Sequence, residues 1–262
     1  TDAVYRVKAM TSYSYGYPMS TVTAHVSACP NHQTLRTTPL QTRFNVAAFG
    51  VCGYECNFFD MKKEELQSYY DSLLQKLVSG ESEFVLNSDR AHNAIIERFM
   101  LDTSSKIKMY CGEMSVFREG FYAHIDKATG NTADNIGETI GEILRRELSE
   151  SLCQFIDKDN SSIDIFFERY DTSMMMDLIA PSLFIKGIRL GKIRLYKLKD
   201  NLFLKNGVVH TSWTDNNIIR IERNPITHEA ICAINAPQNI VDSVKNAFDS
   251  MLEVGEIVRP FS

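Results

Sequence analysis

The sequence has no run of about 18 apolar residues, the length that a helix needs to cross a bilayer. It has no excess of positive charge either: 28 Lys and Arg against 33 Asp and Glu give a net charge of −5, which excludes a general basic surface for nucleic acid or anionic lipid. The opening TDAVYRVKAM lacks the apolar core of a signal peptide. We therefore expect no membrane partner, and a nucleic-acid or phosphate ligand only at a local site.

The 6 cysteines lack the spacing of a zinc or redox motif. Cys52 and Cys56 form the one close pair, but three residues separate them instead of two, and no second pair completes a four-ligand site. Glycine-rich phosphate loops and nucleophile elbows are also missing. We expect reduced, mostly buried thiols in a cytoplasmic protein, with no metal and no cofactor.

Charge is unevenly distributed along the chain. Between residues 9 and 54 the only charged residues are Arg36 and Arg43, whereas beyond residue 60 charges recur every few positions. A stretch with so little charge does not form a solvated surface alone, so we expect other parts of a protein to cover it. The change predicts two domains of separate origin, residues 1–60 and 61–262.

Apolar periodicity outlines the secondary structure. It predicts helices at 61–79 (a connector), from the cap Ser88, around Met174–Met176, at about 136–157, and from Pro237 to about Glu253. Alternation of polar and apolar residues predicts strands at 106–112, 162–168, 192–198, 207–213, 218–223 and 230–235. Because helices and strands alternate, we expect an α/β fold: a mixed, mainly parallel sheet flanked by helices.

Three motifs near the start occur in a fixed order: HVSACPNHQT at 25–34, TPLQTR at 38–43 and FGVCGYE at 49–55. Together they resemble the late catalytic-barrel segment of family-36 glycoside hydrolases, the bacterial α-galactosidases. The resemblance implies a (β/α)8 barrel whose two aspartates cleave a terminal α-galactoside with retention. Strands expected at 21–28 and 46–54 would supply two of the eight barrel strands, an incomplete two-strand fragment.

The departures from that family concern its catalytic residues. The Lys-Trp-Asp context of the nucleophile is missing, and the family's acid/base falls just before residue 1, so Asp2 matches only its neighbour. We expect no catalytic residue here, and an α-galactoside as partner only if the complete barrel exists upstream. His25 and His32 are candidate sugar contacts, with ordinary polar positions as the alternative. Arg36 and Arg43 are expected to pair with acidic groups of the missing barrel.

Residues 83–255 loosely resemble a phospholipase D-type half, through VVHTSWTDNNIIRIE and the closing AICAINAPQNIVDSVKNAFDSML. The family's His-x-Lys-x4-Asp motif, placed on His210, puts Ser212 at the lysine position and Asn217 at the aspartate position. The resemblance then implies a nucleophile with no cation to neutralise phosphoryl oxygens and no carboxylate to stabilise an imidazolium. We expect a non-catalytic relative.

Other residues have simpler interpretations. CGEM at 111–114 follows a predicted strand at the edge where α/β folds bind ligands, and Glu113 with Arg118 either lines such a crevice or forms a surface ion pair. His92 is expected to be exposed or to cap its helix. The sequence thus favours an inactive fragment related to α-galactosidase. The alternative is a non-catalytic α/β binding or effector module that carries a fused galactosidase fragment, natural or an assembly artefact.

Overall fold

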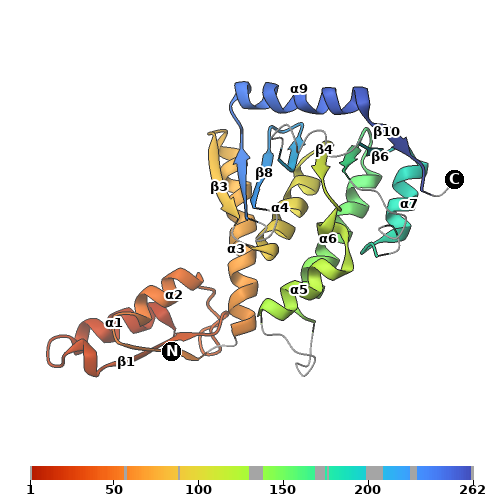
Figure 1. Ribbon diagram of the computed structural model, residues 1–262. Helices are drawn as coiled ribbons and strands as arrows, with labels where there is room; N and C mark the ends of the chain where they lie inside the picture. The colour runs from red at the N-terminus through yellow and green to blue at the C-terminus, as the bar shows by residue number, and fades with distance from the viewer. Residues whose placement is uncertain are drawn as a thin grey trace. The chain divides into compact units, whose positions relative to one another are not determined.

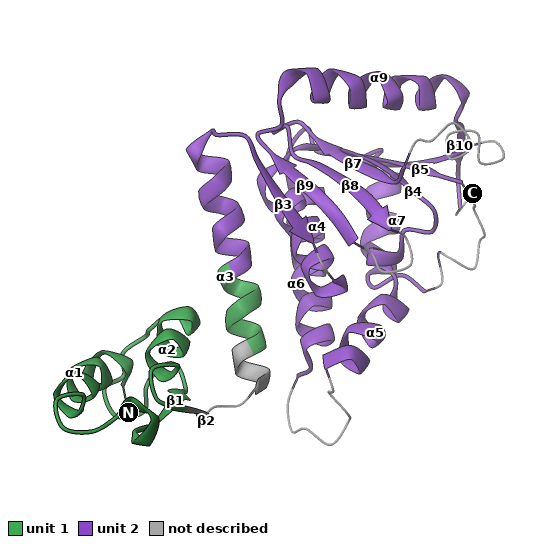
Figure 2. Ribbon diagram, turned by 60° about the vertical axis from the view of Figure 1, so that its left-hand side comes forward, with its two compact units in different colours: residues 1–68 green, residues 69–262 purple. Residues whose placement is uncertain are grey.

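The computed structural model describes residues 2–55, 58–87, 89–129, 138–168, 175, 177–198, 209–224 and 229–260, without the side chains of 52–61. Two compact units make up the chain: unit 1, Thr1–Ser68, and unit 2, Tyr69–Ser262 (Figure 2). The expectations for the side chains of Cys52 and Cys56, the cap Ser88, and Met174 and Met176 lie outside the described residues.

Unit 1 is built around a parallel pair of strands. After α1 (Ala3–Tyr13) and a short 3-10 turn (Met19–Thr21), β1 (Thr23–Ser27) pairs in parallel with β2 (Val51–Glu55), and α2 (Leu40–Ala47) forms the crossover. The expected strand at 46–54 is therefore wrong in its first half. Pro39 occupies the N-cap of α2, and its fixed φ favours the helix that extends to Ala47.

The two arginines of the low-charge stretch find partners inside unit 1, which corrects the expectation that acids of a missing barrel bind them. Arg36 Nη1 lies 2.9 Å from Asp2 Oδ2. Arg43 is buried, and its guanidinium donates to the carbonyls of Thr38 and Ser27 and to the carboxylate of Glu64. These contacts hold together segments that are distant in sequence.

Unit 2 is an α/β layer structure, and α3 (Phe58–Ser79) leads into it from unit 1 (Figure 1). Its strands are β3 (Glu83–Asn87), β4 (Lys106–Cys111), β5 (Ser162–Phe167), β6 (Ile193–Lys197), β7 (Thr211–Thr214), β8 (Ile219–Asn224), β9 (Glu229–Ile234) and β10 (Glu256–Val258). Its further helices are α4 (Arg90–Thr103), α5 (Glu119–Thr129), α6 (Ile140–Asp157), α7 (Pro181–Arg189) and α9 (Gln238–Val254), with a 3-10 turn at Ser115–Phe117. The strands expected from alternation are present, with one difference. The strand expected at 207–213 begins at Thr211: residues 209 and 210 precede it, and residues 207 and 208 lie outside the described residues.

The eight strands form one open sheet in the order β10-β6-β5-β4-β7-β8-β9-β3. Only β4–β5 and β5–β6 pair in parallel, and the other five pairings are antiparallel. The sheet is mixed, as expected, but the expectation that it is mainly parallel is wrong. The reason lies in the second half of the chain, where the turn at Asp215–Asn217 joins β7 to β8 as a hairpin, and such turns produce antiparallel neighbours.

Helices cover both faces of the sheet: α9 lies across one face, and α4, α6 and α7 lie on the other (Figures 1 and 2). Under α9, Phe166 stacks on Tyr196 with ring centroids 4.8 Å apart and also contacts Phe248. Burial of these aromatic rings supplies much of the apolar stabilisation of this layer. No helix in the described ranges has the length and apolarity to cross a membrane.

Candidate functional site

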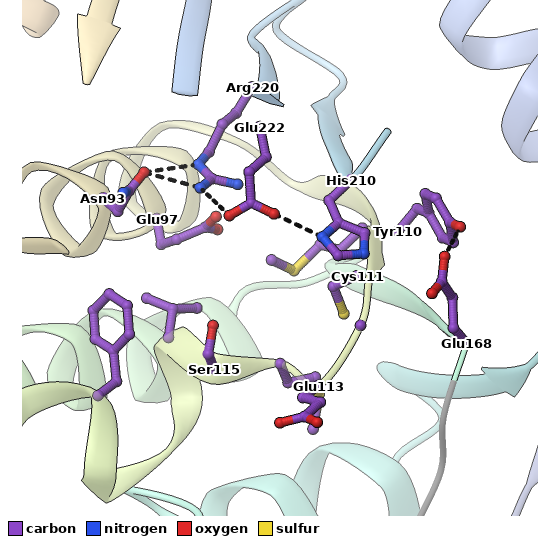
Figure 3. A pocket seen from close by; sticks show the side chains of 15 residues that line it. Asn93, Glu97, Tyr110, Cys111, Glu113, Ser115, Glu168, His210, Arg220 and Glu222 are labelled. Atoms are coloured by element: carbon purple, nitrogen blue, oxygen red, sulfur yellow. Dashed lines mark hydrogen bonds and ion pairs between the residues drawn. The ribbon is translucent and has the colours of Figure 1, made fainter. Parts of the chain in front are cut away.

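A pocket of about 380 Å³ opens at the carboxyl end of β4, where the sequence CGEM leaves the strand (Figure 3). This is the edge at which the sequence predicts a ligand crevice. Its walls come from strands β4 and β8, helices α4 and α5, the segment after β4, and single residues after β5 and before β7. The charged or titratable side chains along it include Glu97, Glu113, Glu168, His210, Arg220 and Glu222.

A histidine–carboxylate pair forms one wall. Nδ1 of His210 lies 2.6 Å from Oε2 of Glu222, and the backbone amide of Glu222 donates to the carbonyl of His210 at 2.9 Å. The two residues thus lie opposite each other, Glu222 on β8 and His210 directly before β7. An ionised carboxylate only accepts hydrogen bonds, so in the neutral imidazole Nδ1 carries the proton and Nε2 holds the lone pair. Nε2 is buried without a hydrogen-bond partner among the described residues.

The cation of the pocket, Arg220, is held by its neighbours. Its Nε and Nη2 donate to Oδ1 of Asn93 at 3.0 and 2.9 Å, and Nη2 lies 3.7 Å from Oε1 of Glu222. The amide of Asn93 in turn donates to the carbonyl of Asp89 at 3.0 Å. Asn93 thus fixes Arg220 by hydrogen bonds, Arg220 forms an ion pair with Glu222, and Glu222 orients the His210 ring.

Glu97 lies one helical turn after Asn93 on α4 and extends into the same pocket (Figure 3). Its exposed fraction is 5%, and its carboxyl makes no hydrogen bond or ion pair with the described residues. Burial raises the pKa of Glu97 to about 7, since the nearby charge of Arg220 offsets only part of this effect and Glu222 adds to it. A buried carboxyl with this pKa exchanges a proton close to neutral pH.

On the far side of His210, the hydroxyl of Tyr110 donates to Glu168, and the Tyr110 ring meets the imidazole edge-on with centroids 5.5 Å apart. Gly112 lies against the imidazole, because a Cβ added there would be 3.3 Å from Cε1 of His210. Burial raises the pKa of the Cys111 thiol to about 12, so this sulfur stays protonated and is not a ready nucleophile.

The rim has an unusual backbone. Met114 has a φ of 51° in the left-handed region, which is uncommon for a residue with a side chain. Met114 is buried, with an exposed fraction of 3%, and it precedes the 3-10 turn Ser115–Phe117, whose first two residues line the pocket. Nearby, Arg118 Nη1 lies 3.3 Å from Glu113 Oε2, so these two residues form an ion pair. Glu113 is also one of the residues that line the pocket.

The structure brings only His210 of the degenerate motif into the pocket. Ser212 is buried within β7, between Met109 and Arg220 in the strand register, and it is not among the lining residues. Asn217 lies in the β7–β8 turn with a φ of 57°. The expectation that no carboxylate lies beside the imidazole is wrong. Glu222 from β8 contacts Nδ1 of His210, although it lies outside the motif.

In unit 1, Asp2 has a structural role. It is buried, and it accepts from the Val4 amide at 2.8 Å, as the N-cap of α1, and from the Thr34 hydroxyl at 2.7 Å. Burial alone raises the pKa of Asp2, but the hydrogen bonds from Thr34 and Val4 and the charge of Arg36 lower it below its usual value. A carboxyl held ionised in this way is a poor proton donor.

The two histidines of the galactosidase-like segment, His25 and His32, have different surroundings. Nε2 of His25 lies 3.0 Å from Nη2 of Arg6 on α1, whereas His32 is an exposed residue of a turn. In unit 2, His92 behaves as expected for a capping region, because its Nδ1 lies 2.8 Å from Oδ1 of Asp89, the N-cap of α4. No group of three His, Cys, Asp or Glu in the described ranges is placed to hold a metal.

Sequence reasoning missed Glu97, Arg220 and Glu222. A signal for the last two exists in the strand IIRIER, where Ile219 and Ile221 face α9 while Arg220 and Glu222 face the opposite side. Two charged residues on the covered side of a central strand are rare without a functional or structural reason. For Glu97, the signal is an acid on the buried face of a helix.

The galactosidase-like motifs are confirmed by comparison with known proteins. Residues 1–76 match the Melibiase family. Alpha-galactosidase 1 of Pediococcus pentosaceus is 43% identical over 75 residues, which cover 29% of this chain and 10% of that protein. Alpha-galactosidase AgaA of Geobacillus stearothermophilus is 46% identical over 67 residues, 26% of this chain and 9% of that protein. The N-terminal part is related to α-galactosidases, and the chain spans about a tenth of the length of these relatives.

Two solved structures are similar to the chain at a lower level. TrmBL2, an archaeal chromatin protein, has a TM-score of 0.41 and 12% identity, covering 89% of this chain and 77% of that one. Nuc of Salmonella typhimurium, a phospholipase D family member, has a TM-score of 0.42 and 11% identity, covering 68% of this chain and 99% of that one. Scores this low establish neither a shared fold nor a shared function.

Proposed function

We propose that residues 1–68 are a piece of an α-galactosidase catalytic barrel and that the 262-residue chain does not hydrolyse α-galactosides by itself. The observation that carries the proposal is the state of Asp2. Retaining hydrolysis needs two carboxyl groups about 5 Å apart across the sugar. Asp2 is the single acid among residues 1–54, and the Thr34 hydroxyl, the Val4 amide and Arg36 already occupy its carboxylate.

The surface of unit 1 supports the same proposal. It exposes several large side chains, among them Tyr5, Tyr13, Tyr15, Tyr17, Phe44 and Phe49. Residues of this kind are covered in a complete barrel and remain exposed when most of the barrel is missing. An α-galactoside is therefore the proposed partner only of a polypeptide that contains the remaining barrel segments.

The test is an assay of the purified chain with p-nitrophenyl α-D-galactoside. We expect no p-nitrophenol release above the buffer blank. Turnover by the chain that disappears in Asp2→Asn would contradict the proposal, because a contaminating enzyme would not respond to this substitution.

A second function concerns unit 2, which we propose is a non-catalytic ligand-binding module. The pocket around His210 supports it, because Nε2 of His210 is buried without a hydrogen-bond partner among the described residues and the buried acid Glu97 lines the same pocket, which marks a place for a ligand. Phosphoryl transfer is the weaker alternative. Ser212 stands at the expected lysine position, and Arg220 is held by Asn93 and Glu222.

A thermal-shift screen of the whole chain tests the binding function. The compounds are nucleotides, oligonucleotides, sugars and amines. We expect at least one compound class to raise the unfolding temperature of the wild type and to lose this effect in His210→Ala. A screen in which no class gives a His210-dependent shift would contradict the proposal.

We further propose that the units have separate origins. The change in charge pattern and the end of the family match at residue 76 support a fusion. Limited trypsin digestion tests it: we expect cleavage at Lys62 or Lys63 to leave a stable C-terminal piece. A full-length chain that resists the protease under the same conditions would contradict it.

A cytoplasmic location is also proposed, and the thiols support it. Cys29, Cys111, Cys153 and Cys232 are free, with Cys232 buried and the other three half-buried. Mass spectrometry after alkylation of the native chain in cell extract should find these thiols reduced. A disulfide between any two of them would contradict this location.

A further inference from the structure

The carboxyl of Glu97 is a strongly polar group of the pocket that has no hydrogen-bond partner among the described residues. The neighbouring Asn93 and Arg220 bind each other, and Glu222 is bonded to His210. Glu97 is 5% exposed, extends from α4 into the cavity, and makes no hydrogen bond or ion pair with the described residues (Figure 3). Leaving a buried carboxyl without a partner is costly, so a ligand that completes its bonding would gain affinity.

Two polar groups of the pocket lack a hydrogen-bond partner among the described residues, and both can accept. Glu97 contributes carboxyl oxygens, and in the neutral imidazole, Nε2 of His210 presents a lone pair because Nδ1 donates to Glu222. Glu113 and Glu168 add two further carboxylates at the wall. A matching ligand must therefore supply hydrogen-bond donors.

The charge balance points to the sign of that ligand. The described lining has four carboxyl groups, on Glu97, Glu113, Glu168 and Glu222, and one Arg or Lys, Arg220, whose guanidinium is already bonded. A phosphate or carboxylate ligand would meet repulsion from these acids, and the guanidinium of Arg220 already donates to Asn93 from Nε and Nη2. The same wall includes the apolar side chains of Met109, Val116 and Phe121.

We propose that this pocket binds a small organic cation, an alkyl ammonium or guanidinium, whose N–H groups donate to Glu97 and whose alkyl part contacts Val116 and Phe121. The proposal rests on the binding function of unit 2. A bidentate hydrogen bond between a guanidinium and a carboxylate is the strongest form of this recognition. The cavity of about 380 Å³ has the size of a small-molecule site.

The proton of Glu97 gives the site a pH dependence. The charges of Arg220 and Glu222 on β8 act on the Glu97 carboxyl, and its own charge acts on Cys111 on β4, Tyr122 on α5 and Cys232 on β9. Further titratable side chains along the pocket include Glu113, Glu168 and His210. Burial raises the pKa of Glu97 to about 7, so the free pocket is partly protonated at neutral pH. A cation binds the ionised form, which means that binding near pH 7 releases protons and tightens as the pH rises to 8.

The test is isothermal titration calorimetry of the whole chain with agmatine, which carries a guanidinium and an ammonium, and with 1,4-diaminobutane. Uncharged 1,4-butanediol and inorganic phosphate are the comparison ligands. We expect agmatine to bind, with weaker binding at pH 6 than at pH 8, and with an enthalpy at pH 7 that changes between PIPES and HEPES buffers because protons are released.

Glu97→Gln keeps the shape of the side chain and removes its charge, so we expect it to weaken agmatine binding about tenfold or more. The matched control is Glu150→Gln on the exposed side of α6, which should bind agmatine as the wild type does. Equal binding by Glu97→Gln, or no binding of either amine, would overturn the cation proposal. If butanediol or phosphate binds instead in a His210-dependent way, the binding function of unit 2 stands and only the ligand class is wrong. If none of the four probes binds, the cation proposal fails, and the wider compound screen decides on the binding function.

Discussion

Nδ1 of His210 and Oε2 of Glu222 lie 2.6 Å apart, on residues that are 12 positions apart in the chain and opposite each other in the sheet. The contact places a carboxylate where the degenerate motif has none. It orients the ring, because a carboxylate accepts a hydrogen bond from Nδ1 and leaves Nε2 unprotonated in the neutral imidazole.

The first prediction concerns this tautomer. In the wild type at pH 8, long-range ¹H–¹⁵N NMR spectra should show His210 with its proton on Nδ1. Glu222→Gln replaces an obligatory acceptor by an amide that either donates or accepts, so a mixture of both tautomers should result. His92, whose Nδ1 contacts Asp89, is the internal control and should not change. An unchanged His210 signal in Glu222→Gln would mean that the carboxylate does not set the ring.

The second prediction concerns the pH dependence of stability. The pKa of Glu97 is raised from 4.5 to about 7 in the folded chain. The folded state then holds the proton more tightly than the unfolded state, so the contribution of Glu97 to stability is fully present below pH 4.5 and is lost as the pH rises through about 7. This loss corresponds to about 3 kcal/mol.

Glu97→Gln removes the titrating group, so it should make unit 2 more stable relative to wild type at pH 8 than at pH 5. Urea unfolding at the two pH values measures this difference. Glu150→Gln should follow the wild-type pH curve. A Glu97→Gln curve that runs parallel to wild type between pH 5 and 8 would show that the carboxyl titrates normally.

The third prediction concerns the layer between the sheet and α9. Phe166 is 0% exposed and lies between Tyr196 and Phe248, so Phe166→Ala should destabilise unit 2 by about 3–5 kcal/mol in urea unfolding. Phe84 on the edge strand β3 is 61% exposed, and Phe84→Ala should change stability by less than about 0.5 kcal/mol. Similar effects of the two substitutions would contradict the core assignment.

The fourth prediction concerns unit 1. Arg43→Lys keeps the charge but not the planar group that reaches Thr38, Ser27 and Glu64 together, so unit 1 should become markedly more sensitive to protease. Lys8→Arg on the exposed side of α1, an exchange of the same two residue types in the reverse direction, is the control. Digestion of Arg43→Lys at the wild-type rate would show that the network contributes little.

Much of the secondary structure of unit 2 was predictable because its signals are local. Strands β4, β5 and β6 alternate apolar and polar residues, and α6 and α9 have helical periodicity, so their bounds fall close to those expected. The pairing of the strands was not predictable in the same way. Whether β7 joins β4 in a parallel or antiparallel sense depends on long-range packing, and the short edge strands β3 and β10 have weak patterns of their own.

The site shows the same division. His210 stood out by residue type, and the segment CGEM by its place after a strand, and both line the pocket. Glu97 and Glu222 meet there only because α4 lies under the sheet beside β8. Their separation of 125 positions leaves no local pattern to connect them.

The most direct measurement compares two ligands on one ¹⁵N-labelled sample of the whole chain, with methyl α-D-galactoside added to one portion and agmatine to another. We predict that agmatine shifts the backbone amides of Glu97, Gly112 and His210, and that the galactoside shifts none in unit 1. Galactoside-dependent shifts around His25 and His32, with no response to agmatine at the pocket, would place the working site in the galactosidase-like segment and contradict the assignment to unit 2.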